Sequence, residues 1–259
     1  MTLEQWVPFR NESVDVRCRL FAFPHAGGSA AFYRPLRLSM PAEIDLCPIE
    51  LPGRGARLGE PPLASMRAIV ERLGELLQPL LMVPFGFFGH SVGAWTAYQA
   101  VRQLRSPQGR SAVHLFVSGR GSPERAGAEP RPARVRSDQE LLAMLRRFGG
   151  TPAAVMQDAE LTAALLPALR ADLALADEYA ADPADRMSCP ITAFGGAEDD
   201  LHLDALRSWN GFTRGPFRLC TFPGGHFYFS PAPRALADEI FRDLRRAGQT
   251  RAAAAGAPS

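Results

Sequence analysis

The chain has 259 residues, of which 46% are hydrophobic, so it is long enough to bury a full core as one α/β domain. Its formal net charge of +2 is too small to indicate a nucleic-acid partner. All 29 basic residues are arginine, which excludes chemistry that needs a lysine, such as a Walker A phosphate site or a Schiff base.

Cysteine usage and hydropathy predict the compartment. The four cysteines are widely spaced and lie in or beside apolar runs, so we expect buried free thiols in a reducing environment. Residues 1–19 lack the apolar core of a secretory signal, and the most membrane-like window, 76–97, is interrupted by proline and glycine. A cytoplasmic protein without membrane contact is the expectation.

Strand-like and helix-like stretches alternate through the first half of the chain. Apolar runs predict strands at 16–23, 44–49, 85–88 and 113–118, and the stretches between them predict helices near 32–39, 64–77 and 92–105. This alternation is typical of an α/β fold with a mostly parallel central sheet and helices on both faces.

The pentapeptide Gly89-His90-Ser91-Val92-Gly93 follows the third predicted strand and opens the next helix. A serine on such a sharp strand-to-helix turn has strained backbone geometry, and its hydroxyl stands clear of the sheet. The flanking glycines allow the close crossing of strand and helix. The pattern alone is weak evidence, but its place between a strand and a helix predicts that Ser91 is a nucleophile.

A small-residue loop, 24–30, follows the first predicted strand and precedes a helix. Such a loop leaves backbone N–H groups unpaired at a helix start, where they can receive an anion. In a serine hydrolase that anion is the oxyanion of the tetrahedral intermediate. A phosphate loop is the competing interpretation, but the lysine pattern that it requires is missing.

Three helical stretches, 137–147, 159–166 and 167–181, follow one another without a strand between them. They predict a helical lid insertion, at about 120–185, over the sheet. Most of its apolar residues should pack, and a minority should line an acyl channel; they are Leu141, Leu145, Val155, Met156, Leu161, Leu165, Leu169 and Leu173.

Alternation resumes with strands at 191–195 and 217–222 and a last helix at 233–246. We therefore expect a single domain over 1–246. Residues 247–259 are mostly alanine, glycine and proline and are expected to form a disordered tail.

A serine hydroxyl needs a histidine to take its proton and a carboxylate to orient that histidine. In the α/β-hydrolase order the acid and then the histidine follow the serine. His226, in a glycine-rich loop after the last strand, fits this order best. The acid should follow the preceding strand, and counting from the strand end selects Asp199, with Asp200 as the competitor.

Six segments together resemble the type II thioesterases, stand-alone editing hydrolases of polyketide and nonribosomal peptide synthesis; they are 23–29, 51–55, 89–94, 149–152, 169–172 and 223–227. The resemblance implies an α/β-hydrolase fold with Ser91 as nucleophile, His226 as base and Asp199 as orienting acid. It implies that the amides of Ala26 and Val92 form the oxyanion hole.

The resemblance also implies the reaction and the partners. The family releases misprimed or stalled acyl groups from the phosphopantetheine arm of acyl or peptidyl carrier proteins and uses no cofactor or metal. We expect a monomer that binds such carrier domains. One departure from the family leaves the choice between Asp199 and Asp200 open. The family often has proline directly after the acid, where this chain has Asp200.

Two other enzyme classes fit parts of the pattern. A carboxylesterase or lipase would share the fold and the triad. A malonyl-type acyltransferase also uses Gly-His-Ser-x-Gly, but Ala94 and the late acid argue against it. The stretch 119–136 has five arginines and two glutamates, so it either steers acidic carrier proteins or is a solvated loop without a partner.

Overall fold

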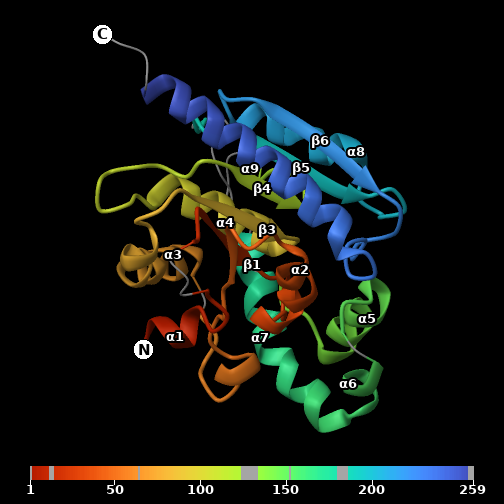
Figure 1. Cartoon of the computed structure of the whole chain (residues 1–259). Helices are drawn as coiled ribbons and strands as arrows, with labels where there is room; N and C mark the ends of the chain where they lie inside the picture. The colour runs from red at the N-terminus through yellow and green to blue at the C-terminus, as the bar shows by residue number, and fades with distance from the viewer. Residues whose placement is uncertain are drawn as a thin grey trace.

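The computed structural model describes residues 2–11, 15–63, 65–123, 134–151, 153–179 and 186–255 (Figure 1). Its centre is a six-stranded sheet in the order β2-β1-β3-β4-β5-β6, in which every neighbouring pair is parallel. The strands are β1 (Cys18–Phe23), β2 (Ile44–Pro48), β3 (Phe85–His90), β4 (Leu115–Ser118), β5 (Ile191–Gly196) and β6 (Phe217–Phe222).

Helices cover both faces of the sheet. The α-helices are α1 (Leu3–Trp6), α2 (Arg34–Ser39), α3 (Met66–Leu76), α4 (Val92–Gln103), α5 (Asp138–Phe148), α6 (Ala153–Gln157), α7 (Ala159–Glu178), α8 (Leu203–Arg207) and α9 (Pro233–Ala255). Short 3-10 segments are η1 (Ala30–Tyr33), η2 (Gly55–Arg57), η3 (Gln78–Leu80) and η4 (Ser208–Phe212). Strand and helix alternate as expected, which confirms the predicted α/β class with a parallel central sheet.

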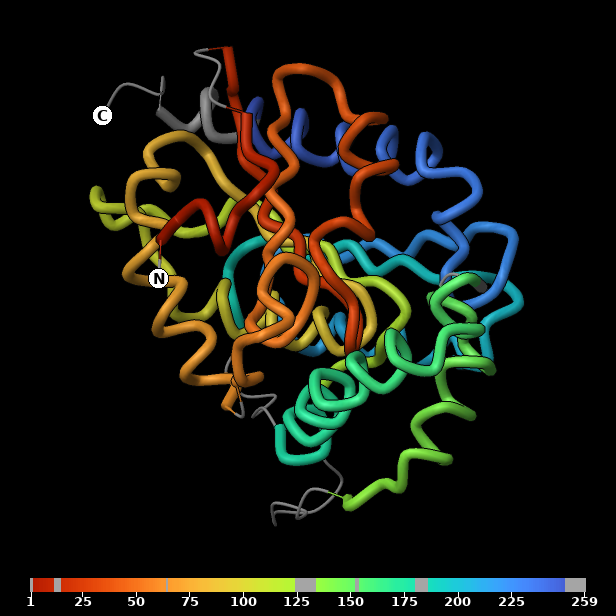
Figure 2. The backbone as a smooth tube through the Cα atoms, turned by 90° about the horizontal axis from the view of Figure 1, so that it is seen from below, coloured from red at the N-terminus to blue at the C-terminus, as the bar shows by residue number. Residues whose placement is uncertain are grey.

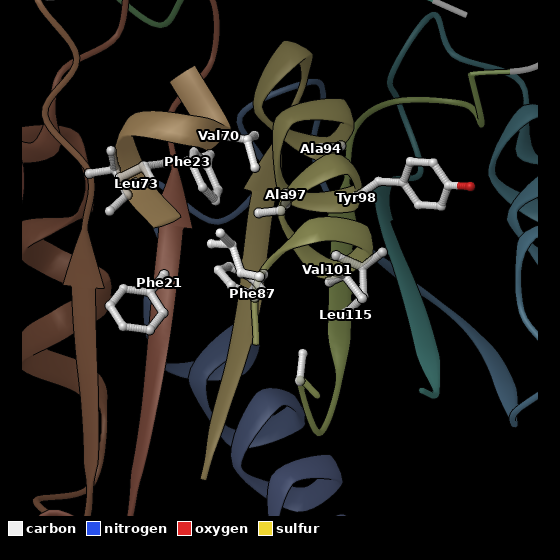
Figure 3. Packing of buried hydrophobic residues seen from close by; sticks show 14 of the residues in the cluster. Phe21, Phe23, Val70, Leu73, Phe87, Ala94, Ala97, Tyr98, Val101 and Leu115 are labelled. Carbon is white, nitrogen blue, oxygen red and sulfur yellow. The ribbon is translucent and has the colours of Figure 1, made fainter. Parts of the chain in front are cut away.

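Alternate residues of the strands supply two separate cores. Phe21, Phe23 and Phe87 point to one face, where they pack with residues of α3 and α4 (Figure 3). Their neighbours Leu20 and Phe88 point to the other face, which α2 and α9 cover. Both faces are thus buried, which explains why these strands are apolar throughout.

We call α5, α6 and α7 the roof helices. They gather on one side of the molecule and lie in front of the sheet when it is seen from below (Figure 2). The two helices predicted at 159–166 and 167–181 form one helix, with Pro167 inside α7. Leu166 and Leu169 are both buried in the cluster between α5 and α7, and this packing holds the helix together across the proline.

The C-terminal segment also differs from the expectation. Residues 247–255 were expected to be disordered, but α9 continues to Ala255, while 256–259 lie outside the described residues. Leu236, Ile240 and Leu244 bury one side of α9 against the sheet. A helix that is already packed extends readily through alanines, which have the highest helix propensity.

Candidate active site

Ser91 occupies the turn between β3 and α4. Its φ of 54° and ψ of −125° make it the one non-glycine residue with positive φ in the described part of the chain. Its amide donates to the Ser118 carbonyl at 2.8 Å. A Cβ at Gly89 would lie 2.1 Å from the Gly93 carbonyl oxygen, so a side chain there would break the crossing. Such strain, held by tight packing, is typical of a functional site.

His226 and Asp199 come together at the same edge of the sheet. His226 Nδ1 lies 2.8 Å from Asp199 Oδ2, and the side chains are 12% and 5% exposed. The Leu201 amide donates to Asp199 Oδ1 at 3.2 Å. Burial acts to raise the pKa of Asp199, but the hydrogen bond and charge of His226 outweigh it, and the pKa is lowered. The carboxylate therefore accepts the Nδ1 proton, which leaves Nε2 as the base.

Asp200 has a different environment. Arg147 Nη2 lies 2.6 Å from Asp200 Oδ2, and both side chains are about two-thirds exposed, at 67% and 69%. Of the two acids that the sequence left open, the structure brings Asp199 to His226, whereas Asp200 contacts Arg147 of α5.

Ala26 and Val92 line the pocket that contains Ser91. Val92 is the first residue of α4, so its N–H has no partner within the helix. In the part of the chain that the structure describes, neither amide has a hydrogen-bond acceptor. Both are thus available to an oxygen atom bound beside Ser91.

Two further histidines, His25 and His90, lie near His226 and are uncharged. Burial lowers the pKa of His25 to about 3, with His226 and Arg54 adding to the effect. Burial likewise holds the pKa of His90 well below its usual value, and its Nδ1 contacts Ser118 Oγ at 2.9 Å. Only His226 has a carboxylate beside it, so the other two rings act as neutral packing groups.

A pocket of about 310 Å³ contains Ser91 and His226. Its roof side is mostly apolar and comes from two helices, with Arg147 of α5 as the charged exception; the apolar residues are Met144, Leu145 and Phe148 on α5, and Leu169 and Leu173 on α7. Three of the apolar lid residues named from the sequence thus line the pocket. Among the others, Leu141 is fully buried in packing, whereas Leu161 is 48% exposed. This wall suits an apolar acyl group.

Arg120 also lines the pocket, which the sequence pattern did not indicate. Its guanidinium lies 4.0 Å from the centre of the Trp95 ring, and burial lowers its pKa. Its position two residues after β4, at the edge that carries Ser91, is the signal that would have identified it.

Other arginines of the basic stretch pair within the protein. Arg136 donates to both oxygens of Asp177, at 2.6 and 3.0 Å, and Arg134 contacts Glu140 at 2.6 Å. Arg125 and Arg131 lie outside the described residues. Ion pairs within the protein therefore neutralise Arg134 and Arg136, two of the five arginines that the sequence offered for docking of an acidic carrier protein.

The described residues contain neither a candidate metal site nor a candidate membrane-spanning helix. No group of three or more His, Cys, Asp or Glu side chains there is arranged to hold a metal ion. No helix there is both long enough and apolar enough to span a bilayer.

Comparisons with known proteins point to one family. The family model of the thioesterase domain matches residues 18–246. The gramicidin S biosynthesis protein GrsT of Aneurinibacillus migulanus is 36% identical over 244 residues, covering 94% of this chain and 95% of that protein. The type II thioesterase BorB of the borrelidin cluster has a TM-score of 0.80 at 35% identity, covering 92% and 97% of the two chains. RedJ, the prodiginine-pathway thioesterase of Streptomyces coelicolor, has a TM-score of 0.78 at 33% identity, covering 88% and 86%.

Proposed function

The chain belongs to the thioesterase family, and from this premise we propose that it releases acyl groups from carrier proteins through an acyl-enzyme on Ser91. It is a thioesterase, and its likeness is to the type II thioesterases of polyketide and nonribosomal peptide pathways. The observation that carries the mechanism is the 2.8 Å contact between His226 and Asp199 beside the strained Ser91.

Acylation begins when Ser91 Oγ attacks the carbonyl carbon of the thioester. His226 Nε2 takes the hydroxyl proton, and Asp199 stabilises the imidazolium that forms. The amides of Ala26 and Val92 donate to the oxyanion of the tetrahedral intermediate. The C–S bond then breaks, and His226 gives its proton to the departing pantetheine sulfur, which leaves the acyl group as an ester on Ser91.

Hydrolysis repeats these steps with water. His226 takes a proton from water while the water oxygen attacks the ester carbonyl, and the same two amides donate to the oxyanion. The Ser91–acyl bond breaks, His226 returns the proton to Ser91 Oγ, and the carboxylic acid leaves. The proposed cycle uses no cofactor or metal, because the triad supplies both the nucleophile and the proton transfers.

The pocket supports an acyl substrate delivered on an arm. Its roof is mostly apolar, so burial of a hydrocarbon chain against Leu145 and Leu173 contributes binding without a specific hydrogen bond. Such a wall tolerates varied chains, as the release of misprimed groups from synthase modules requires. We propose carrier domains of a polyketide synthase or nonribosomal peptide synthetase as the partners.

The test is to mix the protein with carrier proteins loaded with different acyl groups and to follow both proteins by intact-mass spectrometry. We expect loss of the acyl group from the carrier and a transient acyl adduct on Ser91. Ser91→Ala should abolish the adduct and lower kcat by about 10⁴-fold or more, since only binding and the oxyanion hole remain. Ser122→Ala is the matched serine control, because Ser122 contacts Ser208 outside the triad.

A serine-directed fluorophosphonate that labels the Ser91→Ala protein stoichiometrically would contradict the nucleophile. Faster turnover of simple oxygen esters than of carrier thioesters would contradict the substrate class and favour a carboxylesterase.

A further inference from the structure

A buried ion pair joins α7, a wall of the pocket, to the loop after β2. Arg54 Nη1 and Nη2 donate to Asp172 Oδ2 and Oδ1 at 2.5 and 3.0 Å. The two residues are only 1% and 4% exposed. Arg54 lies between Gly53 and Gly55, whose φ values of +83° and +52° favour glycine. The backbone on both sides of Arg54 thus adopts a conformation that residues other than glycine rarely adopt.

The same carboxylate also holds the loop that carries Ala26. Asp172 Oδ2 accepts a hydrogen bond from the Gly27 amide at 2.8 Å. The next amide, of Gly28, donates to the His25 carbonyl at 2.9 Å and closes a turn around Ala26. Gly27 has a φ of +71° within this turn. The direction of the Ala26 N–H therefore depends on where Asp172 holds the turn.

Asp172 belongs to α7, which is itself a wall of the pocket. Leu169 and Leu173, on the same helix, line the pocket, and a Cβ at Gly27 would lie 3.3 Å from Leu169 Cβ. One carboxylate thus connects segments that are 118 and 145 residues away in the sequence. It sets the distance between the apolar wall and the loop after β1.

We propose that Arg54 and Asp172 are positioning residues for thioester hydrolysis: their ion pair fixes the turn that presents the Ala26 amide to the oxyanion. The inference rests on the proposed function, in which Ala26 is an oxyanion donor. It goes beyond that function because the Arg54–Asp172 pair does not contact the reacting atoms and nevertheless controls kcat.

Electrostatics gives the two partners unequal roles. Asp172 contacts the amide of Gly27, the residue after Ala26, so an unpaired carboxylate there would repel the negative charge that develops on the oxyanion. Arg54 neutralises this carboxylate. Removal of Arg54 therefore destabilises the transition state in two ways, because it leaves the carboxylate unpaired and because it releases the turn. Asp172→Asn keeps an oxygen for the Gly27 amide and removes the charge, so it should lower kcat less.

Stability alone is the competing explanation, because loss of one partner from a buried ion pair is strongly destabilising. The variants should therefore be compared per functional site, with Ser91 titrated by a fluorophosphonate and kcat measured on a small acyl-thiol substrate. Arg136→Gln is the matched control, since Arg136 forms a similar two-point pair with Asp177 of α7 but does not contact the loop.

We expect kcat per titrated site to fall about 10²-fold in Arg54→Gln and about tenfold in Asp172→Asn, with KM nearly unchanged. The double variant should recover activity relative to Arg54→Gln, because the unpaired carboxylate is gone. A boronic acid that mimics the tetrahedral intermediate should lose affinity in parallel with kcat. Arg136→Gln should keep the wild-type kcat.

A lower titrated fraction with an unchanged kcat per site, in Arg54→Gln or in the milder Asp172→Asn, would overturn the positioning role and leave a structural one. Failure of the proposed function would be seen separately, as absence of labelling or turnover in the wild-type protein.

Discussion

The two sides of the pocket roof are attached to the protein in different ways. α7 is held by the buried Arg54–Asp172 pair. α5 reaches the loop after β5 through the exposed Arg147–Asp200 pair. Removal of one partner from a buried pair costs several kcal/mol, whereas an exposed pair contributes about 0–1 kcal/mol. The roof is thus one fixed wall and one weakly held wall.

The predicted helical lid is therefore not expected to move as a single unit. Local opening requires few buried contacts, and among the ion pairs α5 has the weaker attachment to the sheet edge. We expect α5 and α6 to open for the pantetheine arm while α7 remains in place and keeps the oxyanion loop aligned. The neighbours Asp199 and Asp200 mark the boundary, since one contacts the triad histidine and the other contacts α5.

The largest expected effect on kcat comes from loss of the contact between Asp199 and His226. Asp199→Asn should lower kcat by about 10⁴-fold, because an amide does not hold His226 in the tautomer that leaves Nε2 free. Asp200→Asn is the adjacent control and should change kcat less than about threefold, as expected for a screened surface pair. Steady-state kinetics on a small acyl thioester measure both. The reverse ranking would assign Asp200 to His226 and remove the boundary between the two walls.

The second prediction concerns Glu50, which is 4% exposed and accepts from the Ala30 amide at 3.3 Å beside the oxyanion loop. Burial raises its pKa to about 7, although the Ala30 amide and the charges of Arg54 and Arg57 act in the opposite direction. A raised pKa means that the folded state binds the proton more tightly, so stability is full below the unfolded pKa and is lost as pH rises through about 7.

Glu50→Gln should therefore match the wild type near pH 4 and exceed its free energy of unfolding by about 1–3 kcal/mol near pH 8. Urea unfolding at the two pH values measures this difference. A less stable variant near pH 8 would mean that Glu50 is ionised and stabilised by the two arginines, and the fixed wall would then lose its pH dependence.

The third prediction compares two adjacent glycines at the end of α5. A Cβ at Gly150 would lie 2.3 Å from Phe227 Cζ, next to His226, whereas a Cβ at Gly149 meets nothing within 4 Å. Gly150→Ala should displace the α5 wall or Phe227 and lower kcat/KM about tenfold, as overpacking does. Gly149 has a φ of +77°, so alanine there should cost about 1 kcal/mol at the helix end.

Gly149→Ala should leave kcat/KM within about twofold of the wild type, since it has no neighbour at the triad. Equal losses of kcat/KM in the two variants would show that the helix end, and not the contact with Phe227, controls the α5 wall.

Local patterns made much of the site predictable. Ser91 and His226 are marked by glycines at turns whose geometry needs them, and such signals are read within a few residues. Counting from the strand end selected Asp199, which lies beside His226, but Asp200 stayed a competitor because neighbouring loop residues point in directions that only the folded loop determines. The Arg54–Asp172 pair was not predictable, since nothing in either segment specifies a partner 118 residues away. At Pro167 the local pattern gave a wrong prediction. It indicated two helices, but buried packing on both sides of the proline keeps α7 as one helix.

The smallest effect tests the weakly held wall directly. Arg147 and Asp200 are both exposed, so Arg147→Gln should raise hydrogen exchange of the α5 amides by no more than about fivefold at low ionic strength. Salt at about 0.5 M should give the wild type the same increase, because it screens the pair, and should add little in the variant. The α7 amides are the internal reference, since their buried ion pair is screened much less by salt. If α5 and α7 exchange accelerated together, the roof would open as one unit, and the Arg54–Asp172 pair would not hold α7 in place during opening.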